Sequence, residues 1–174
     1  MIDNVLLDIN MHMNPTRVEI ELTEQCNLKC KFCYNSQDPL ISDNVFEIID
    51  RLHEAGVMEV ILTGGEPLTH PRFFDILKKC CKCFYKAMIQ TNGTFIDAET
   101  ARIFKQLGVY GVNVSLHGNE ELHEKLTLVQ GSYAQAYSAL QHLVSEGVNT
   151  TSNFVLTTEN VIGFSDALRN LYDM

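Results

Sequence analysis

Strand-like and helix-like segments alternate along this chain of 174 residues. The strand candidates are 16–22, 59–63, 85–91, 110–116 and 150–156. Parallel strands must be joined by long crossovers, and a helix is the usual one. The alternation therefore predicts an α/β fold in which parallel strands form one sheet. In the first strand, Val18, Ile20 and Leu22 alternate with polar residues, which indicates a half-exposed strand such as one at a sheet edge.

Capping residues and apolar spacing predict where the helices begin and end. The expected first helix has Ser42 as its cap and Gly56 as its stop signal. Asp97 is expected to cap a helix that ends at Gly108, and Ser132 with Gln135 has the spacing of a capping box. The remaining helices are expected after Pro71 and at the C-terminus, over 164–171.

The length bounds the architecture. A closed barrel of eight βα units needs about 250 residues, and this chain is far shorter. We therefore expect an open partial barrel that stops after five units, with the C-terminal end of the domain missing. The predicted division is an N-terminal arm over 1–15 and one core domain over 16–174. We also expect the isolated chain to be incomplete as an enzyme.

Composition excludes several classes of protein. The formal net charge is −9, which argues against a nucleic-acid partner, because such surfaces need clustered Lys and Arg. No stretch reaches the about 18 apolar residues of a membrane span, and no secretion signal is visible at the N-terminus. The sequence thus predicts a soluble, cytoplasmic protein without a membrane partner.

Three of the six cysteines, Cys26, Cys30 and Cys33, lie in a C-x3-C-x2-C pattern directly after the first strand. In a reducing compartment, such clustering is typical of metal binding rather than of disulfides. Structural zinc and ferredoxin-type clusters normally use four protein ligands. Three thiolates without an evident fourth favour a [4Fe–4S] cluster with one iron open to a small molecule. Zinc and a plain electron-transfer cluster remain as alternatives.

A second motif, Thr63-Gly-Gly-Glu-Pro67, follows the second strand. Loops at the carboxyl ends of parallel strands build the ligand sites of such folds. Gly64 and Gly65 would let a ligand approach the backbone, and Glu66 could accept a hydrogen bond from a cationic amine. Because the two motifs follow neighbouring strands, we expect them to converge in space. A tight strand-to-helix turn is the alternative interpretation.

Together these motifs resemble the radical S-adenosylmethionine (radical SAM) superfamily. The likeness rests on the cysteine triad with Phe32 before its last member, on the Gly-Gly-Glu-Pro motif, and on 90–93, 114–118, 131–133 and 153–160. It covers about 14–165. The set of motifs is most similar to that of the branch containing molybdenum-cofactor biosynthesis enzymes and SPASM-type maturases, which modify peptides and proteins.

The resemblance implies the cofactors and their ligands. Cys26, Cys30 and Cys33 would hold a [4Fe–4S] cluster, and S-adenosylmethionine would chelate its open iron. Residues of the second motif, Gly64, Gly65 and Glu66, would bind the methionyl amine. The further cofactor contacts implied are Phe32 at the adenine, Ser115 at the carboxylate or ribose, and Asn153 as a weaker candidate.

The resemblance also implies the chemistry. Reductive cleavage of S-adenosylmethionine would give a 5′-deoxyadenosyl radical that abstracts hydrogen from a substrate, either a peptide or protein or a cofactor precursor. An electron donor such as flavodoxin or ferredoxin would be the partner. Two alternatives stay open: an activase of a glycyl-radical enzyme, and a non-catalytic iron–sulfur or zinc-binding module.

Other reactive residues receive plainer interpretations. Cys80, Cys81 and Cys83 resemble a second metal cluster, yet they lie at the far end of a predicted helix, away from the triad. We expect them to serve as small apolar residues. His117, two residues after Ser115, is expected in a loop near solvent, with a substrate contact as the alternative.

Overall fold

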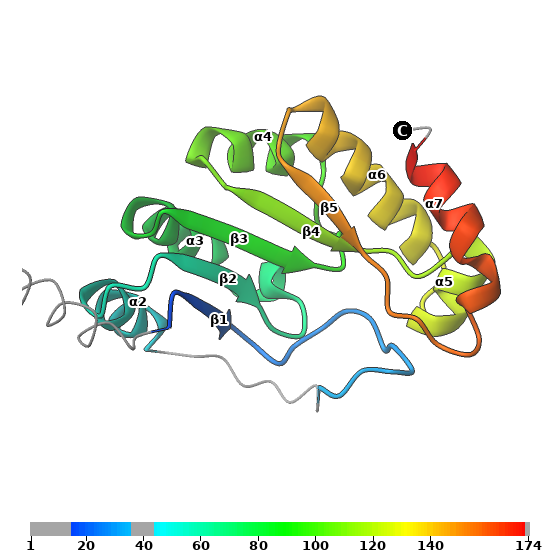
Figure 1. Cartoon of the computed structure of the whole chain (residues 1–174), viewed down its shortest axis with the longest axis horizontal. Coiled ribbons are helices and arrows are strands. Elements are labelled where there is room, and N and C mark those ends of the chain that lie inside the picture. The colour runs from blue at the N-terminus through cyan, green and yellow to red at the C-terminus, as the bar shows by residue number, and fades with distance from the viewer. Residues whose placement is uncertain (1–14, 36–43, 173–174) are drawn as a thin grey trace, which may run out of the picture.

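The computed structural model describes residues 15–35 and 44–172, which form a five-stranded sheet in the order β1-β2-β3-β4-β5 (Figure 1). All neighbouring strands are parallel. The strands are β1 (Arg17–Glu21), β2 (Glu59–Thr63), β3 (Lys86–Thr91), β4 (Gly111–Ser115) and β5 (Thr150–Asn153). The predicted open α/β architecture is confirmed, and β1 lies at a sheet edge as its polar alternation predicts.

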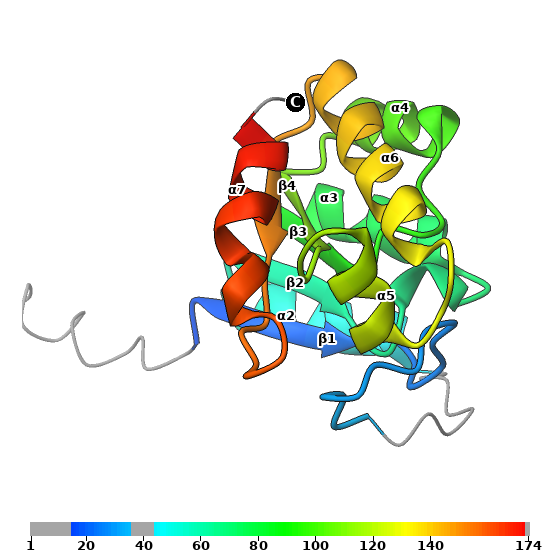
Figure 2. The same cartoon turned by 90° about the vertical axis from the view of Figure 1, so that its right-hand side faces the viewer.

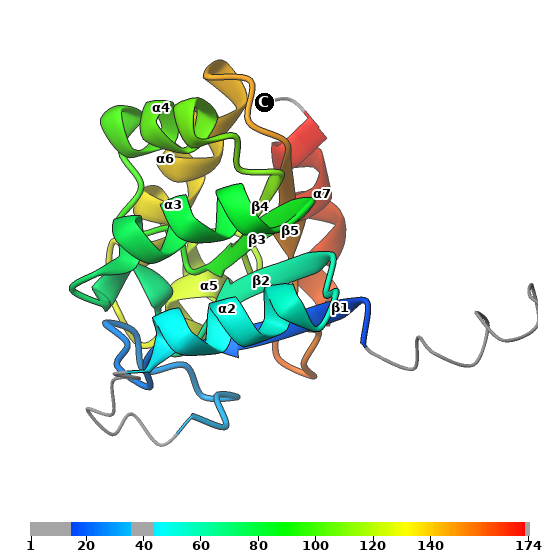
Figure 3. The ribbon, with the colours of Figure 1, turned by 90° about the vertical axis from the view of Figure 1, so that its left-hand side faces the viewer.

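Helices connect successive strands, and the last helix follows β5. They are α2 (Val45–Glu54), α3 (Phe73–Cys83), α4 (Ala98–Leu107), α5 (Glu120–Thr127), α6 (Ser132–Ser145) and α7 (Phe164–Tyr172), with short 3₁₀ turns η1 (Pro67–Thr69) and η2 (Val161–Gly163). In Figure 3, α2, α3 and α4 lie side by side across one face of the sheet. None of the helices in the described part of the chain is long and apolar enough to cross a bilayer. The predicted cap Ser42 and all but the last residue of the predicted arm lie outside the described residues.

The core lies between the sheet and these helices. Strand residues Leu62, Ile89 and Val114 are completely buried there, as are Leu77 of α3 and Phe104 of α4. Such burial is the main favourable contribution to folding. Residues that alternate with them on the strands point to the other face and are only partly buried, which leaves that face polar toward the carboxyl ends of β3 to β5.

The caps of α4 confirm the sequence prediction, whereas the capping box of α6 is wrong. Asp97 accepts a hydrogen bond from the Thr100 backbone N–H, and Gly108 ends the helix with φ of +74°. At α6 the cap residue is Gly131, with no side-chain capping bond. The Ser132 hydroxyl instead pairs with the buried Thr127 hydroxyl at 2.8 Å. A tertiary partner thus replaces the local one.

Two further features of the helices do not follow from the sequence pattern alone. The sequence analysis did not predict α5, because half of this eight-residue helix is charged and it presents few apolar positions. In α3 the buried face is Phe73, Ile76, Leu77 and Cys80, while Phe74 is 44% exposed. Phe73 and Phe74 are adjacent and both apolar, and packing against the sheet buries Phe73 and leaves Phe74 toward solvent.

We predict that Phe104→Ala lowers the free energy of unfolding by about 3–5 kcal/mol, because removing the ring leaves a cavity in the apolar core. Phe104 is fully buried, and its ring lies 6.2 Å from the ring of Phe73. Urea unfolding followed by circular dichroism measures the change. The control Tyr172→Ala removes a side chain that is 91% exposed and should shift the unfolding free energy little. Equal effects of the two substitutions would contradict this description of the core.

Candidate functional site

The three cysteines lie on the segment that follows β1, and backbone hydrogen bonds fix this cysteine loop (residues 22–35) to α5. The N–H groups of Lys29 and Lys31 donate to the carbonyls of Thr127 and Leu126 at 3.1 and 2.9 Å. These carbonyls belong to the C-terminal end of α5, where helical partners are missing. Figure 2 faces the carboxyl ends of the first strands and shows α5 at this end of the molecule. The helix that the sequence analysis missed is therefore one support of the cysteine loop.

The Gly-Gly-Glu motif is the second support. The N–H of Gly65 donates to the Thr23 carbonyl at 2.8 Å, and the N–H of Glu66 donates to the Gln25 carbonyl at 2.7 Å. A Cβ at Gly64, whose φ is +147°, would overlap the Thr23 carbonyl, and one at Gly65 would overlap the Gln25 carbonyl. The glycines thus let two backbone segments lie in contact, just before Cys26.

These segments border a cavity of about 370 Å³ at the carboxyl ends of the strands. That volume lies within the range of pockets that hold small molecules. Among the predicted site residues, those that line it are Cys26, Cys30, Cys33, Phe32, Gly64, Gly65, Ser115 and Asn153. The structure therefore brings together residues from four segments of the chain, namely the cysteine loop, the glycine motif, and the ends of β4 and β5. Their contacts with cofactors stay predictions.

The thiols have the surroundings of cluster ligands. Backbone N–H groups of Leu28 and Asn35 donate to the sulfurs of Cys26 and Cys33, each at 3.4 Å, and such bonds tune iron–sulfur clusters. Burial and the neighbouring sulfurs raise the pKa of Cys30 to about 11, so binding a metal must displace its proton. Within 15–35 and 44–172, no three Cys, His, Asp or Glu side chains are grouped to hold a metal ion. Three cysteine thiols on one loop, with backbone N–H donors to two of their sulfurs, are a donor set that fits an iron–sulfur cluster.

Glu66 is placed differently from the other predicted residues. It is fully buried and lies outside the cavity lining. Its carboxylate accepts from the N–H groups of Leu68 and Asn92, at 3.1 and 2.7 Å, and from the Thr91 hydroxyl at 2.8 Å. Burial raises the pKa of Glu66 to about 7 against the effect of these donors. Its predicted contact with an amine stays a prediction, and in this structure its observed role is to hold the end of β3.

Asn92, held by Glu66, reaches the cysteine loop. Its side-chain amide donates to Asn27 Oδ1 at 2.8 Å and lies 3.8 Å from the Cys26 sulfur. Asn27 in turn donates to the Thr94 hydroxyl at 2.8 Å. The sequence analysis noted Gln90-Thr-Asn-Gly93 as part of the resemblance but gave Asn92 no role. Glu66 therefore acts on the cysteine loop through Asn92.

The expectation that His117 lies near solvent is wrong. Its side chain is among the buried polar groups, only 3% exposed, and it lines the cavity together with His123 of α5. The two rings stack with centroids 5.5 Å apart. Burial lowers the pKa of each histidine to about 4, so both rings are neutral near pH 7. The cavity lining in the described part of the chain contains no Lys or Arg.

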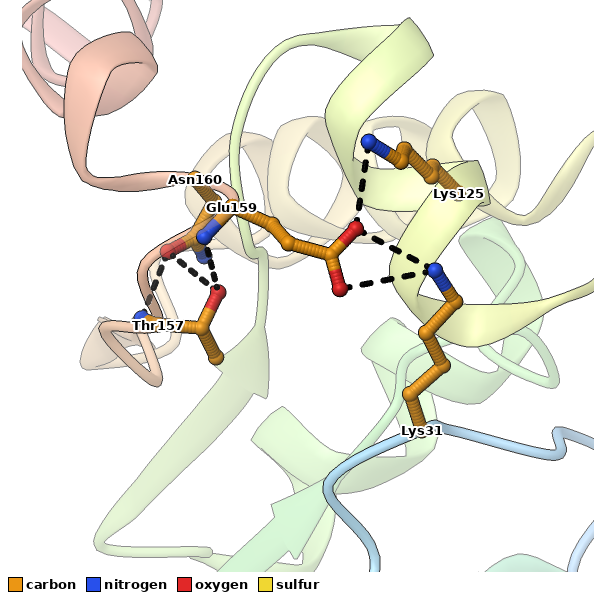
Figure 4. Close-up of polar contacts among 5 residues, drawn as sticks. All are labelled: Lys31, Lys125, Thr157, Glu159 and Asn160. Carbon is orange, nitrogen blue, oxygen red and sulfur yellow. Dashed lines mark hydrogen bonds and ion pairs between the residues drawn. The ribbon is translucent and has the colours of Figure 1, made fainter.

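An ion-pair network joins the cysteine loop to two other segments (Figure 4). Glu159, in the segment after β5, contacts the ammonium groups of Lys31 at 3.2 Å and of Lys125 at 3.1 Å. The hydrogen bonds from Lys125 and Lys31 hold the pKa of Glu159 below its usual range. Pairs this exposed contribute little energy singly. Their significance is that they connect the cysteine loop, α5 and the segment before η2 at one place.

The second cysteine group does not belong to this site. Cys80 is completely buried in the core on α3, and neither it nor Cys81 and Cys83 lines the cavity. Burial raises the pKa of Cys80 to about 12 and that of Cys81 to about 11, which keeps both as neutral thiols. Their interpretation as small apolar side chains agrees with this placement.

We predict that Gly64→Ala destabilises the chain by about 2–3 kcal/mol and lowers the iron bound after reconstitution, because the new Cβ displaces the backbone before Cys26. The matched control is Gly108→Ala. It also has a positive φ of +74°, but a Cβ there meets nothing within 4 Å. The control should cost about 1 kcal/mol and leave iron binding unchanged. Melting temperatures and iron assays measure both effects, and equal iron loss in the two variants would contradict the prediction.

The histidine pair predicts a pH dependence of stability. Because folding lowers both histidine pKa values from 6.5 to about 4, the unfolded chain binds more protons in this range. The contribution of the two histidines to the free energy of unfolding is complete above pH 6.5 and is lost as the pH falls toward 4. Glu66 has the opposite effect on stability. Because folding raises its pKa from 4.5 to about 7, Glu66 stabilises the folded chain at low pH, and this stabilisation is lost as the pH rises from 4.5 through 7.

Replacing one histidine isolates this effect. His123→Gln should flatten the fall of unfolding free energy between pH 6.5 and 4.5 by up to about 1.4 kcal/mol per pH unit, the value of one proton. Urea unfolding at several pH values measures the slopes. Parallel curves for the parent and the variant would show that His123 does not stay neutral in the folded chain.

Comparisons with known proteins agree with this geometry. The family model for the radical SAM superfamily matches residues 20–171. The chain is 30% identical over 168 residues to the antilisterial bacteriocin subtilosin biosynthesis protein AlbA of Bacillus subtilis, which covers 92% of this chain and 37% of that protein. It is 30% identical over 146 residues to the Fe-coproporphyrin III synthase of Methanosarcina barkeri, covering 80% of this chain and 37% of that enzyme.

A solved structure supports the fold. The crystal structure of Streptococcus suis SuiB superimposes with a TM-score of 0.82 at 21% identity, covering 98% of this chain and 41% of SuiB. The chain thus spans about two fifths of the length of the relatives it matches. The family match extends over nearly all of the sheet and helices described above. The chain belongs to the radical SAM superfamily.

Proposed function

We propose that this chain is the catalytic core of an enzyme that cleaves S-adenosylmethionine reductively and uses the resulting radical to abstract hydrogen from a substrate. The observation that carries the proposal is the convergence of Cys26, Cys30 and Cys33 with Gly64 and Gly65 on one cavity. The relatives are named as maturases and synthases, which favours an enzyme over a non-catalytic module. None of the names given above is that of a glycyl-radical activase.

The cofactor assignment follows from the residues present. Cys26, Cys30 and Cys33 would hold the [4Fe–4S] cluster, and the amide donors around them would stabilise their thiolates. When bound, the cluster supplies the electron that breaks the C5′–S bond of S-adenosylmethionine. Gly64 and Gly65 would present backbone groups to the methionyl end. Ser115, Asn153 and Phe32 line the remaining cavity and would contact the rest of the molecule.

The protein's own contribution is to position ligands and exclude water. Hydrogen bonds from two glycine-motif amides and from α5 carbonyls fix the cysteine loop, which sets where the thiols lie. Excluding water would protect a reactive radical, and the buried residues His117 and His123 form part of the wall that would do so. No general base is required for the cleavage itself, and both cavity histidines are neutral near pH 7.

The substrate belongs to one of two classes named by the relatives. SuiB has been solved with the precursor peptide SuiA, and other relatives are heme or Fe-coproporphyrin synthases. We propose that this chain acts on a peptide or protein or on a cofactor precursor, with flavodoxin or ferredoxin as electron donor. Three closely spaced free thiols favour reducing surroundings, so a cytoplasmic location is part of this proposal. We also propose that residues 16–174 form a single core domain.

The test is anaerobic reconstitution with iron and sulfide, followed by dithionite and S-adenosylmethionine. We expect about four iron and four sulfide per chain and the release of 5′-deoxyadenosine. Cys30→Ala should abolish the product, because it removes one of three cluster ligands. The control Cys83→Ala changes a thiol that does not line the cavity and should retain it. Stoichiometric zinc in place of iron, or product from Cys30→Ala, would contradict the proposal.

A further inference from the structure

The second and third thiols of the cysteine loop have other supports than the first. Cys26 follows the backbone contact with the glycine motif, and the Asn92 amide lies 3.8 Å from its sulfur. Cys30 and Cys33 lie further along the loop, where the N–H of Cys33 donates to the Cys30 carbonyl at 3.0 Å. That bond closes a turn, which we call the thiol turn (residues 30–33). Contacts from other elements must fix where the thiol turn lies.

Lys31, inside the thiol turn, is held both at its backbone and at its side chain. Its backbone N–H donates to the Leu126 carbonyl of α5 at 2.9 Å. Its ammonium lies 3.2 Å from Glu159 Oε2 and 3.5 Å from Oε1, although the two residues are 128 positions apart in the sequence. Lys31 therefore connects the thiol turn to α5 and to the segment after β5.

Glu159 is presented on a turn with many hydrogen bonds (Figure 4). Asn160 Oδ1 accepts from the Thr157 N–H at 2.7 Å and from its hydroxyl at 3.0 Å, and the Glu159 N–H donates to that hydroxyl at 3.3 Å. Asn160 is completely buried, and its amide donates to the carbonyls of His117 and Val155, each at 2.9 Å. Because the backbone of Glu159 is already fixed, an ion pair at this residue loses less conformational entropy than one between two mobile segments.

One oxygen of Glu159 serves two lysines from different elements. Oε2 lies 3.2 Å from the ammonium of Lys31 and 3.1 Å from the ammonium of Lys125 on α5. The two ammonium groups are therefore close together, and the carboxylate between them offsets their repulsion. Removing this one negative charge would break two attractions and would also leave two like charges facing each other. The shared carboxylate thus has a larger effect on the thiol turn than a single exposed ion pair has.

We propose that Glu159 is a positioning residue for the thiols of Cys30 and Cys33. Together with Lys31 and Lys125 it forms a charge clamp that holds the thiol turn against α5 and the segment after β5. The inference rests on the proposed function, which makes these thiols cluster ligands. Glu159 does not line the cavity and would act through Lys31. The side chains of Lys31, Glu159 and Lys125 are 37%, 38% and 53% exposed, so dissolved ions reach the clamp and weaken it.

Thiol labelling of the chain without its cluster tests the clamp directly. Limiting iodoacetamide followed by mass spectrometry gives the labelling rate of Cys30 relative to that of Cys26, which is also half-buried but is supported by the glycine motif. At low salt, Glu159→Gln should raise this ratio about fivefold, because the thiol turn opens more often. The matched control Asp166→Asn breaks an exposed ion pair of the same length, 3.2 Å, on α7 and should leave the ratio unchanged.

Salt and a second substitution distinguish charge from packing. In the parent, sodium chloride screens the attraction and should raise the Cys30 ratio, whereas in Glu159→Gln it screens the repulsion between Lys31 and Lys125 and should lower that ratio. For the same reason, adding Lys125→Gln to Glu159→Gln should lower the ratio below that of Glu159→Gln alone. A side chain that contributed packing alone would show neither effect.

Cluster retention is the second measurement. In chains reconstituted with iron and sulfide, a chelator should remove the visible absorbance of the cluster about fivefold faster from Glu159→Gln than from the parent. Added salt should reduce this difference, and Asp166→Asn should lose its cluster at the rate of the parent. Melting temperatures check that each variant is folded.

The outcomes separate the clamp from the proposed function. Equal Cys30 ratios in the parent and Glu159→Gln would overturn the inference and leave the proposed function intact, as would salt effects of the same sign in both. A parent chain that assembles no iron–sulfur cluster would overturn the proposed function, and the labelling ratios would still decide whether the clamp holds Cys30. If Glu159→Gln does not fold, Lys31→Gln takes its place, and a Cys30 ratio equal to that of the parent then contradicts the inference.

Discussion

The contact between the backbone of Gly64 and Gly65 and the backbone of Thr23 to Gln25 is the constraint on which the site depends. It extends the pairing of β1 and β2 beyond the ends of both strands, through bonds of 2.7–2.9 Å. Side chains at the glycines would overlap carbonyl oxygens, so no other residue allows this approach. Since Cys26 follows directly, the geometry of the first thiol is tied to the sheet itself. The other contacts of the cysteine loop hold the residues that follow Cys26.

Those supports come from every later unit of the fold. Asn92 after β3 reaches Asn27 and Cys26, the end of α5 accepts from the loop backbone, and Glu159 beyond β5 contacts Lys31. A loop of irregular structure would otherwise leave its backbone groups to water. Here many of them have protein partners, which holds three thiols in place without a regular helix or strand. The fold thus serves the site through several weak contacts rather than one strong one.

The electrostatics of the cavity fit a ligand that carries its own charges. Histidine rings are neutral, Glu66 is turned away, and no Lys or Arg lines the cavity within the described residues. The thiols are the groups that become charged, once a metal displaces their protons. Neutral donors and backbone groups then recognise the polar atoms of a small molecule by direction rather than by charge.

The sequence by itself determined the sheet, most helix ends, the cysteine triad and the glycine motif. These features are local: strand alternation, the Asp97 cap and the C-x3-C-x2-C spacing depend on neighbours along the chain. Only the tertiary structure decided that Glu66 faces Asn92, that Ser132 pairs with Thr127 instead of capping its helix, and that His117 is buried between Phe32 and His123. The physical reason is that each of these depends on partners from other βα units. Burial and hydrogen-bond satisfaction are set by the three-dimensional surroundings, which no local pattern encodes.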